Sequence, residues 1–334
     1  MAQTQPDISV IIVNYNVKEY LSSCLGSIYK ASQGLKVEIF VVDNASTDGS
    51  REYIPSHFPD VNYIYNQENA GFGKANNQAI RQAEGQYTLI INPDTLISED
   101  TLSVMKRVMD TYPNCGAAGC KILNADGSFA PESRRSVPTI KSAAFKVLGL
   151  HNLFPESKTF ASYYMGWMDE NEASEVPVLS GAFMFFRTEV IQQLGGFDER
   201  FFMYGEDIDL CYRTTDAGYS IRYVPETSII HYKGESTRKD DIRYIKLFNK
   251  ALYQFFEKHY TSRYSLLFRS LIFLAIVIRG ATAFLVSRFK RGKFLLLDLL
   301  SLNLALLGSF VIRFAFTDAL SEKLESLESL EFLW

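Results

Sequence analysis

The chain has 334 residues, enough for one large domain or two small ones with a substantial core. Its 34 basic and 38 acidic side chains give a net charge of -4, which excludes the global basic field of a protein whose main partner is nucleic acid. The four cysteines have neither metal-ligand spacing nor the density of a disulfide framework, so we expect reduced thiols in a cytoplasmic protein. The N-terminus carries no basic-then-apolar export signal, which favours the same location.

Strands alternate with helices along the first third of the chain. Apolar runs predict strands, and each is followed by a polar loop and a segment whose apolar residues recur at helical spacing. The predicted strands cover residues 8–13, 37–42, 61–65 and 89–91. Such alternation implies right-handed crossovers and predicts an α/β fold with a mainly parallel sheet flanked by helices. The polar loops then fall on one sheet edge, where open α/β sheets bind ligands.

The next part of the chain is less regular. Periodicity weakens from Cys115 to about Pro177, which predicts an extended loop with one small helix near residues 143–150. Further strands are predicted at residues 178–186, 221–224 and 227–231. In the first of these, Gly181 indicates a close approach of another part of the backbone.

Two carboxylates follow buried strands in the predicted sheet. Asp94 comes after the run Leu89–Ile91, and Pro93 prevents that strand from continuing. Asp43 ends the second strand in the same way. We expect both to line one cleft, where one would recognise a base or ribose and the other would bind a metal. The alternatives are a strand-ending turn at Asp94 and an Asx turn at Asp43.

The third predicted helix begins with a glycine-containing segment, residues 69–74. Its Gly71-Phe72-Gly73 is a weak match to a dinucleotide fingerprint, since Asn76 stands at the third glycine position. We expect Asn69 to cap the helix, so that its free amides and dipole face a phosphate with help from Lys74. The alternative is a glycine-containing helix start without a ligand.

The composition changes after Ser265. Two apolar runs, residues 266–289 and 294–316, are interrupted by charges and separated by a basic connection. We therefore predict an α/β domain over residues 1–262 and a C-terminal helical, membrane-associating region over 263–334. Its helices would lie in the cytoplasmic membrane interface, with basic side chains reaching anionic head groups. The alternatives are a soluble helical subdomain packed on the sheet and a spanning hairpin.

Seven motifs, in order and at the right intervals, resemble glycosyltransferase family 2, whose members are inverting enzymes on the GT-A (nucleotide-diphospho-sugar transferase) fold. The resemblance covers about residues 7 to 260. Within the family, the chain is similar to the rhamnosyltransferase-type branch that builds bacterial surface polysaccharides. The matching segments are Ser9–Asn16, Val41–Asn44 with Ser46, Asp48 and Gly49, Asn69–Gly73, Asn92–Asp94, Ser180–Ala182, Gly195–Glu199 and Tyr204–Leu210.

The resemblance implies a donor site and a metal. The residues that would hold the nucleotide base and ribose are Asn14, Tyr15 and Asp43. Asp94 would be the carboxylate of the family's Asp-X-Asp metal element, whose first position is Asn92 here and therefore carries one negative charge fewer. A divalent ion, Mg or Mn, would then be held chiefly by the donor diphosphate and Asp94, with His231 as second protein ligand. The alternative for His231 is a structural role.

The resemblance also places the catalytic residues. In the family, the second acidic residue of the Glu206-Asp207 pair is the base, so Asp207 would take the acceptor proton while Glu206 has a positioning role. The start of a helix favours an ionised carboxylate there. The residues of the proposed acceptor or phosphate loops are Arg134, Arg135, Gly181 and Ala182. The alternative for the two arginines is a solvated charge pair.

These features predict an inverting glycosyltransferase, a hexosyltransferase peripheral on the inner face of the cell membrane. It would move a sugar from a nucleotide-diphosphate sugar, with dTDP-rhamnose as a candidate, to a hydroxyl of a lipid-linked or polysaccharide acceptor. One alternative is a sugar nucleotidylyltransferase, although no Gly-rich, Arg-containing loop follows the first strand. Another is a nucleotide-sugar-binding scaffold of a polysaccharide assembly complex, which the missing first carboxylate at Asn92 motivates.

Overall fold

The computed structural model describes residues 5–139, 141–142, 145, 150–232, 242–260, 298–309 and 313. The chain divides into two compact units, residues 1–280 and 281–334. Most of the helix predicted near residues 143–150, the basic connection at 288–293 and the last residues of the chain lie outside the described residues. The predicted domain boundary at residues 262–263 also lies there and stays a prediction.

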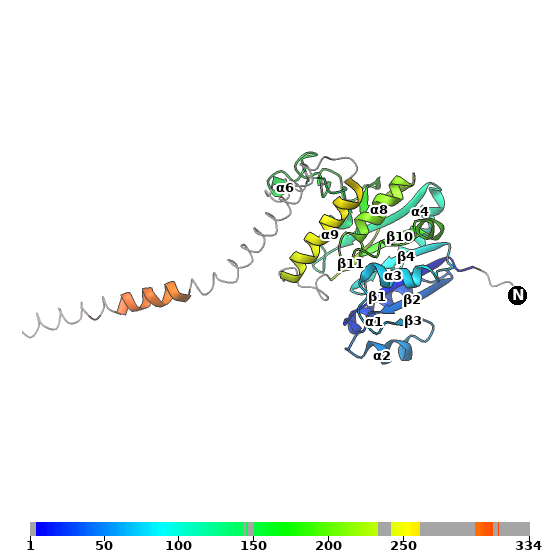
Figure 1. Cartoon of the computed structure of the whole chain (residues 1–334), viewed down its shortest axis with the longest axis horizontal. Coiled ribbons are helices and arrows are strands. Elements are labelled where there is room, and N and C mark those ends of the chain that lie inside the picture. The colour runs from blue at the N-terminus through cyan, green and yellow to red at the C-terminus, as the bar shows by residue number, and fades with distance from the viewer. Residues whose placement is uncertain are drawn as a thin grey trace, which may run out of the picture. The chain divides into compact units, whose positions relative to one another are not determined.

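The first unit contains an α/β sheet with helices between its strands (Figure 1). The strands are β1 (Ile8–Asn14), β2 (Val37–Asp43), β3 (Asn62–Tyr65), β4 (Tyr87–Ile91), β5 (Thr95–Ile97), β6 (Cys115–Leu123), β7 (Arg134–Arg135), β8 (Ser174–Glu175), β9 (Val178–Leu179), β10 (Phe183–Arg187) and β11 (Ser220–His231). The helices are α1 (Lys18–Ala31), α2 (Ser50–His57), α3 (Phe72–Ile80), α4 (Thr101–Thr111), the 3-10 turn η1 (Pro131–Ser133), α6 (Leu150–Leu153), α7 (Thr188–Gln193), α8 (Glu206–Asp216) and α9 (Ile242–Tyr260).

The strand order of the main sheet is β3-β2-β1-β4-β10-β6-β11-β5. The strands β3, β2, β1 and β4 are parallel neighbours, and β6 pairs in parallel with β11. Strand β10 runs antiparallel between β4 and β6. The predicted α/β fold with a mainly parallel sheet is confirmed, and the polar loops after β1, β2 and β4 lie at one edge because these strands share a direction.

Two apolar cores cover the two faces of the sheet. Successive side chains of a strand point to opposite faces, so Val10 and Ile12 join one core while Ile11 joins the other. The first core also contains the buried sides of α1 and α4, and the second those of α3, α8 and α9. The amphipathic spacing read from the sequence therefore selects which side of each helix is buried.

The extended loop predicted from Cys115 to about Pro177 is wrong for its first nine residues, because residues 115–123 form strand β6 inside the main sheet. The first six residues of β6, Cys115 to Cys120, are small and lack the apolar signal of a strand. The packing explains this composition: a Cβ at Gly116 would lie 2.8 Å from Tyr219 Cβ, and one at Gly119 would lie 2.6 Å from Leu179 Cδ2. Neighbouring side chains occupy the space that larger residues would need.

Two other strand predictions change in detail. The run at residues 178–186 is divided into β9 and β10 by a short loop at Ser180–Ala182. The predicted strands at residues 221–224 and 227–231 form one strand, β11, with a register shift between Val224 and Ser228. Pro225 falls at this irregularity, where its missing N–H costs no ladder hydrogen bond.

Helices α8 and α9 lie side by side (Figure 1) and are joined by the buried carboxylate of Asp209. It accepts hydrogen bonds from Arg213 Nε at 2.8 Å and His259 Nε2 at 2.7 Å, and lies 2.7 Å from Lys258 Nζ. Burial raises the pKa of Asp209, but these three partners outweigh burial and hold it below its ordinary value. Asp209 therefore fixes α8 against α9 from a position one turn inside the helix.

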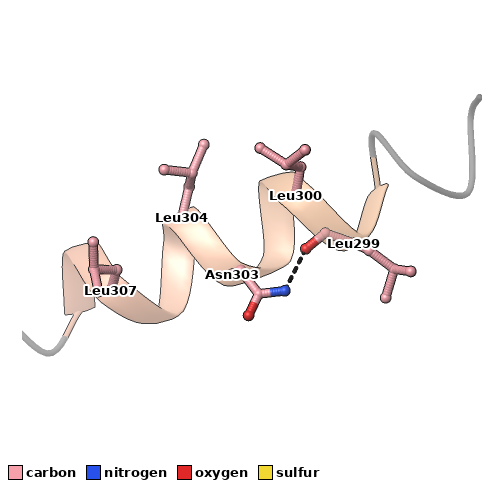
Figure 2. A pocket seen from close by; sticks show the side chains of 5 residues that line it. All are labelled: Leu299, Leu300, Asn303, Leu304 and Leu307. Atoms are coloured by element: carbon pink, nitrogen blue, oxygen red, sulfur yellow. Dashed lines mark hydrogen bonds between the residues drawn. The ribbon is translucent and has the colours of Figure 1, made fainter.

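The second unit contributes the helical residues 298–309, which belong to the second predicted apolar run. Figure 2 shows Leu300, Leu304 and Leu307 along one side of this segment, with Asn303 Nδ2 donating to Leu299 O at 2.7 Å. All four leucines are exposed. Within the described ranges, no helix has both the length and the apolar composition needed to cross a membrane.

Candidate functional site

The first part of the site lies at the carboxyl ends of β1 and β2. The parallel register pairs Asn14 with Asp43, and Asn14 Nδ2 donates to Asp43 Oδ2 at 2.7 Å. The carboxylate of Asp43 is fully buried and also accepts from Ser46 N at 2.7 Å and Tyr63 OH at 2.9 Å. The bond from Ser46 N comes from three residues along the chain, one residue further than in the Asx turn that the sequence offered as the alternative for Asp43. Asp43 is therefore fixed in one orientation, with Tyr15 exposed beside it.

A second group gathers Asn92, Asp94 and His231. His231 ends β11, which pairs with β5, and its Nε2 lies 3.2 Å from Asp94 Oδ1 and 3.4 Å from Asn92 Nδ2. Asp94 is only 6% exposed, and His231 Nδ1 is buried without a hydrogen-bond partner among the described residues. The structure thus brings together the two residues predicted to bind metal, which lie far apart in the sequence.

This group fits a divalent cation that takes most of its ligands from another molecule. A carboxylate and an imidazole are suitable donors, but Asn92 supplies an amide where a second carboxylate would stand. The part of the chain that the structure describes contains no group of three or more His, Cys, Asp or Glu residues placed to hold a metal. Asp94 and His231 would therefore hold the ion together with a bound diphosphate.

The predicted cap at Asn69 is wrong. The N-cap of α3 is Gly71, at φ 85°, and Asn69 Oδ1 instead accepts a hydrogen bond from Gly71 N at 3.0 Å. A Cβ at Gly71 would lie 2.7 Å from Phe202 O, which accepts from Phe72 N at 2.9 Å. Only glycine fits this approach, and the Phe72 amide is not available to a phosphate. Lys74 is exposed on the first turn of α3.

A third group surrounds Asp207 in the first turn of α8. Asp207 Oδ2 accepts from Arg135 Nη2 at 2.5 Å and from Gly181 N at 3.1 Å, and its Oδ1 accepts from Ile208 N at 2.8 Å. The side chains of Arg135 and Asp207 are each 13% exposed. A Cβ at Gly181 would lie 3.4 Å from Asp207 Cβ, which is ordinary van der Waals contact, so the loop at Gly181 packs directly against Asp207.

The two neighbouring arginines have different surroundings. In β7 they alternate, so that Arg134 points away from Asp207. The guanidinium of Arg134 donates to the carbonyls of Met168 and Asp169 and lies 5.1 Å from the ring centre of Tyr223. Burial lowers the pKa of Arg134. The solvated charge pair is therefore wrong for both arginines, and Arg134 does not join the other predicted site residues.

Glu206 is buried beside Asp207, and within the part of the chain that the structure describes its Oε2 has no hydrogen-bond partner. Burial, and to a lesser extent the charge of Asp207, raises the pKa of Glu206 to about 8. Below that pH the side chain is neutral. The two adjacent carboxyl groups consequently differ: Asp207 is paired with a cation, and Glu206 is a protonated acid at neutral pH.

Short backbone links join these groups. Ala182 O accepts from Asn92 N at 3.1 Å, so the loop at Ser180–Ala182 contacts both the Asn92 group and Asp207. Phe202 likewise connects the start of α3 to the segment before α8. The sequence interpretation missed Tyr63, which holds Asp43. No local signal marks it, because its partner lies on the neighbouring strand.

The fold and the site, with carboxylates at the sheet edge and an acidic pair at the start of a helix, fit the GT-A glycosyltransferases that the sequence motifs resemble. The family model described as glycosyl transferase family 2 matches residues 9–195. A second model, described as the N-terminal domain of galactosyltransferase, matches residues 168–235.

The chain is 30% identical over 261 residues to N-acetylglucosaminyl-diphospho-decaprenol L-rhamnosyltransferase of Mycobacterium tuberculosis, covering 74% of this chain and 83% of that protein. It is 27% identical to rhamnosyltransferase WbbL of Escherichia coli, covering 69% of this chain and 85% of WbbL. The mannosyltransferase PcManGT of Pyrobaculum calidifontis, solved with GDP-Man and Mn2+, has a similar fold, with a TM-score of 0.54, 21% identity and coverage of 91% of this chain and 81% of PcManGT.

The chain belongs to glycosyltransferase family 2 and is rhamnosyltransferase-like, as its motifs predicted. It is accordingly a glycosyltransferase, which excludes the nucleotidylyltransferase alternative.

Proposed function

We propose that this protein is an inverting transferase that moves L-rhamnose from dTDP-rhamnose to a hydroxyl of a lipid-linked sugar. The relationship to the Mycobacterium tuberculosis and Escherichia coli rhamnosyltransferases supports rhamnose as the transferred sugar, and the name of the Mycobacterium tuberculosis relative supports a lipid-linked acceptor. The catalytic assignment rests on one observation: Arg135 and Gly181 hold the carboxylate of Asp207 beside the loop that contacts Asn92.

The residues divide into a donor side and an acceptor side. On the donor side, Asn14, Tyr15 and Asp43 would bind the base and ribose. Asp94 and His231 would hold a divalent cation, which when bound would neutralise charge on the leaving diphosphate. Asn92 would contact the same diphosphate as a neutral hydrogen-bond donor.

On the acceptor side, Asp207 takes the proton from the acceptor hydroxyl. The hydroxyl oxygen forms a bond to the anomeric carbon, and the bond from that carbon to the diphosphate oxygen breaks. The nucleoside diphosphate leaves with the electron pair, and the anomeric configuration is inverted. Glu206, neutral and buried, would support the position of Asp207 without competing for the proton.

The test is transfer by the purified full chain with Mg or Mn, dTDP-rhamnose and a short-chain polyprenyl-diphospho-N-acetylglucosamine. We expect a rhamnosylated lipid with inverted configuration and stoichiometric release of dTDP. Turnover only with a different nucleotide sugar would overturn the donor assignment. Binding of nucleotide sugars without transfer or slow donor hydrolysis would instead support a scaffold.

Asp94→Ala is expected to weaken donor binding by at least about tenfold when Mn2+ is present and to change it little with a chelator. The reason is that Asp94 acts through the ion. Donor titration calorimetry with and without EDTA provides the measurement. Asn92→Asp is the matched control, because a second carboxylate should tighten metal-dependent binding. An equal loss for Asp94→Ala under both conditions would show that Asp94 only shapes the loop.

We also propose that the C-terminal region binds the membrane surface. Its basic connection lies outside the described residues, and the proposal rests on the sequence alone. Replacing Arg288, Lys290, Arg291 and Lys293 with Gln should reduce the fraction of protein that sediments with anionic liposomes. The expected loss of binding free energy is ~1 kcal/mol per basic residue near the surface. The matched control replaces four exposed basic residues of the α/β unit, Lys30, Lys36, Arg81 and Arg107. Equal binding by both variants contradicts the proposal.

A further inference from the structure

We propose that Arg135 is a positioning residue for the transfer step, which holds Asp207 Oδ2 so that Oδ1 receives the acceptor proton. The inference rests on the proposed function, in which Asp207 is the base. It assigns Arg135 to the carboxylate, whereas the sequence interpretation placed it on a loop that binds a phosphate.

The hydrogen bonds of Asp207 distinguish its two oxygens. Oδ2 accepts from Arg135 Nη2 at 2.5 Å and from the Gly181 amide at 3.1 Å. Oδ1 accepts from the Ile208 amide at 2.8 Å. A carboxylate offers about four acceptor positions, two on each oxygen. Among the contacts of the described residues, Oδ2 is fully used, and the remaining acceptor position lies on Oδ1.

Arg135 is held rigidly and is not free to close on a phosphate. Its Nη2 also donates to Leu179 O at 2.8 Å, and its guanidinium hydrogen-bonds with Tyr163. The backbone of Arg135 pairs with Val178 in the small β7–β9 sheet. Burial disfavours its charged form, but the nearby charge of Asp207 outweighs this and raises the pKa of Arg135 above its ordinary value. The guanidinium is therefore a permanent cation beside Asp207.

The other groups near Asp207 make this cation necessary. From its own helix, Glu206 and Cys211 interact with the Asp207 charge, and Tyr163 contacts the partner arginine. Burial raises the pKa of Cys211 to about 12, so this thiol is neutral. Without Arg135, the buried carboxyl of Glu206 and the largely buried carboxyl of Asp207 would share the site without the cation that now contacts Asp207. An unpaired buried carboxylate takes up a proton at higher pH, which would inactivate the base.

The experiment compares Arg135→Ala and Arg135→Lys with Arg134→Ala in the full chain, under the transfer assay given above. We expect Arg135→Ala to lower kcat up to about 100-fold, with little change in donor KM, because a misplaced catalytic group costs that much. The acid limb of its kcat pH profile should move to higher pH, and added guanidinium should restore part of kcat. Arg135→Lys should be intermediate, because it keeps the charge and loses the planar fork.

Arg134→Ala is the matched control: a buried neighbour that should lower thermal stability without moving the pH profile or responding to guanidinium. A raised donor KM for Arg135→Ala with unchanged kcat and pH profile would assign Arg135 to the donor phosphate and overturn the inference. If Arg135→Ala does not fold, Arg135→Lys provides the test. A kcat and a pH profile equal to those of the wild type in Arg135→Lys would then overturn the inference. Asp207→Asn distinguishes failure of the proposed base from failure of the proposed role of Arg135. Near-normal transfer by Asp207→Asn refutes Asp207 as the base, whatever the Arg135 variants show.

Discussion

Asp207→Asn is expected to lower the rate of transfer by about 100- to 10,000-fold, the usual effect of losing a general base, while donor affinity stays nearly unchanged. Asparagine keeps the size of the side chain, and its carbonyl oxygen can still accept from Arg135 and Gly181. The atom that takes the proton is lost. Glu206 cannot replace it, because adjacent residues of a helix point about 100° apart.

Glu206→Gln is the matched control for this experiment, since it changes the neighbouring carboxyl in the same way. We expect a milder loss of activity, because Glu206 is already neutral at pH 7. Donor titration by calorimetry and turnover with the lipid acceptor would be measured for both variants. Near-normal transfer by Asp207→Asn together with an inactive Glu206→Gln would show that the roles are reversed. Near-normal transfer by both variants would show that neither carboxyl at the start of α8 is the catalytic base.

The second large expected effect is a pH dependence of the free energy of unfolding that comes from Glu206. Burial, followed by the charge of Asp207, raises the pKa of Glu206 from 4.5 in the unfolded chain to about 8 in the folded protein. Between these values the folded state holds a proton that the unfolded state has released. The free energy of unfolding therefore falls as pH rises from about 4.5 to about 8, by an amount on the order of a few kcal/mol at ~1.4 kcal/mol per pKa unit.

Glu206→Gln removes this titration and should become more stable relative to the wild type across the same pH range. The measurement is chemical denaturation of both proteins at pH 5, 7 and 9. Glu68→Gln, which changes an exposed carboxyl, controls for the simple loss of a glutamate. A stability difference between Glu206→Gln and wild type that stays constant over this range would mean that Glu206 is hydrated or partnered in the folded protein.

The sequence was sufficient for the fold where burial leaves a strong signal. Strands β1, β2 and β4 are fully or largely buried on both faces and therefore read as continuous apolar runs. Strand β6 is equally central, but close packing against Tyr219 and Leu179 requires small residues, which carry no such signal. The prediction failed there because the constraint comes from side chains distant in sequence.

The same distinction applies to the site. The pairing of Asn14 with Asp43 follows from parallel strands ending at one edge, so their proximity could be predicted. The pairing of Arg135 with Asp207 joins residues on a two-residue strand and a helix start, which no periodicity connects. Asn69 shows the limit of a local rule: its side chain suits a cap, but the helix begins at a glycine that fits against Phe202.

The alternation in β7 has a consequence for comparing this chain with its relatives. Arg134 and Arg135 are consecutive, and strand geometry sends one toward Tyr223 and the other toward Asp207. A one-residue slip of β7 against β9 would exchange their directions, as it does in any strand. An aligned pair of arginines is therefore not enough to infer an active relative, because the register of β7 against β9 determines which arginine reaches Asp207.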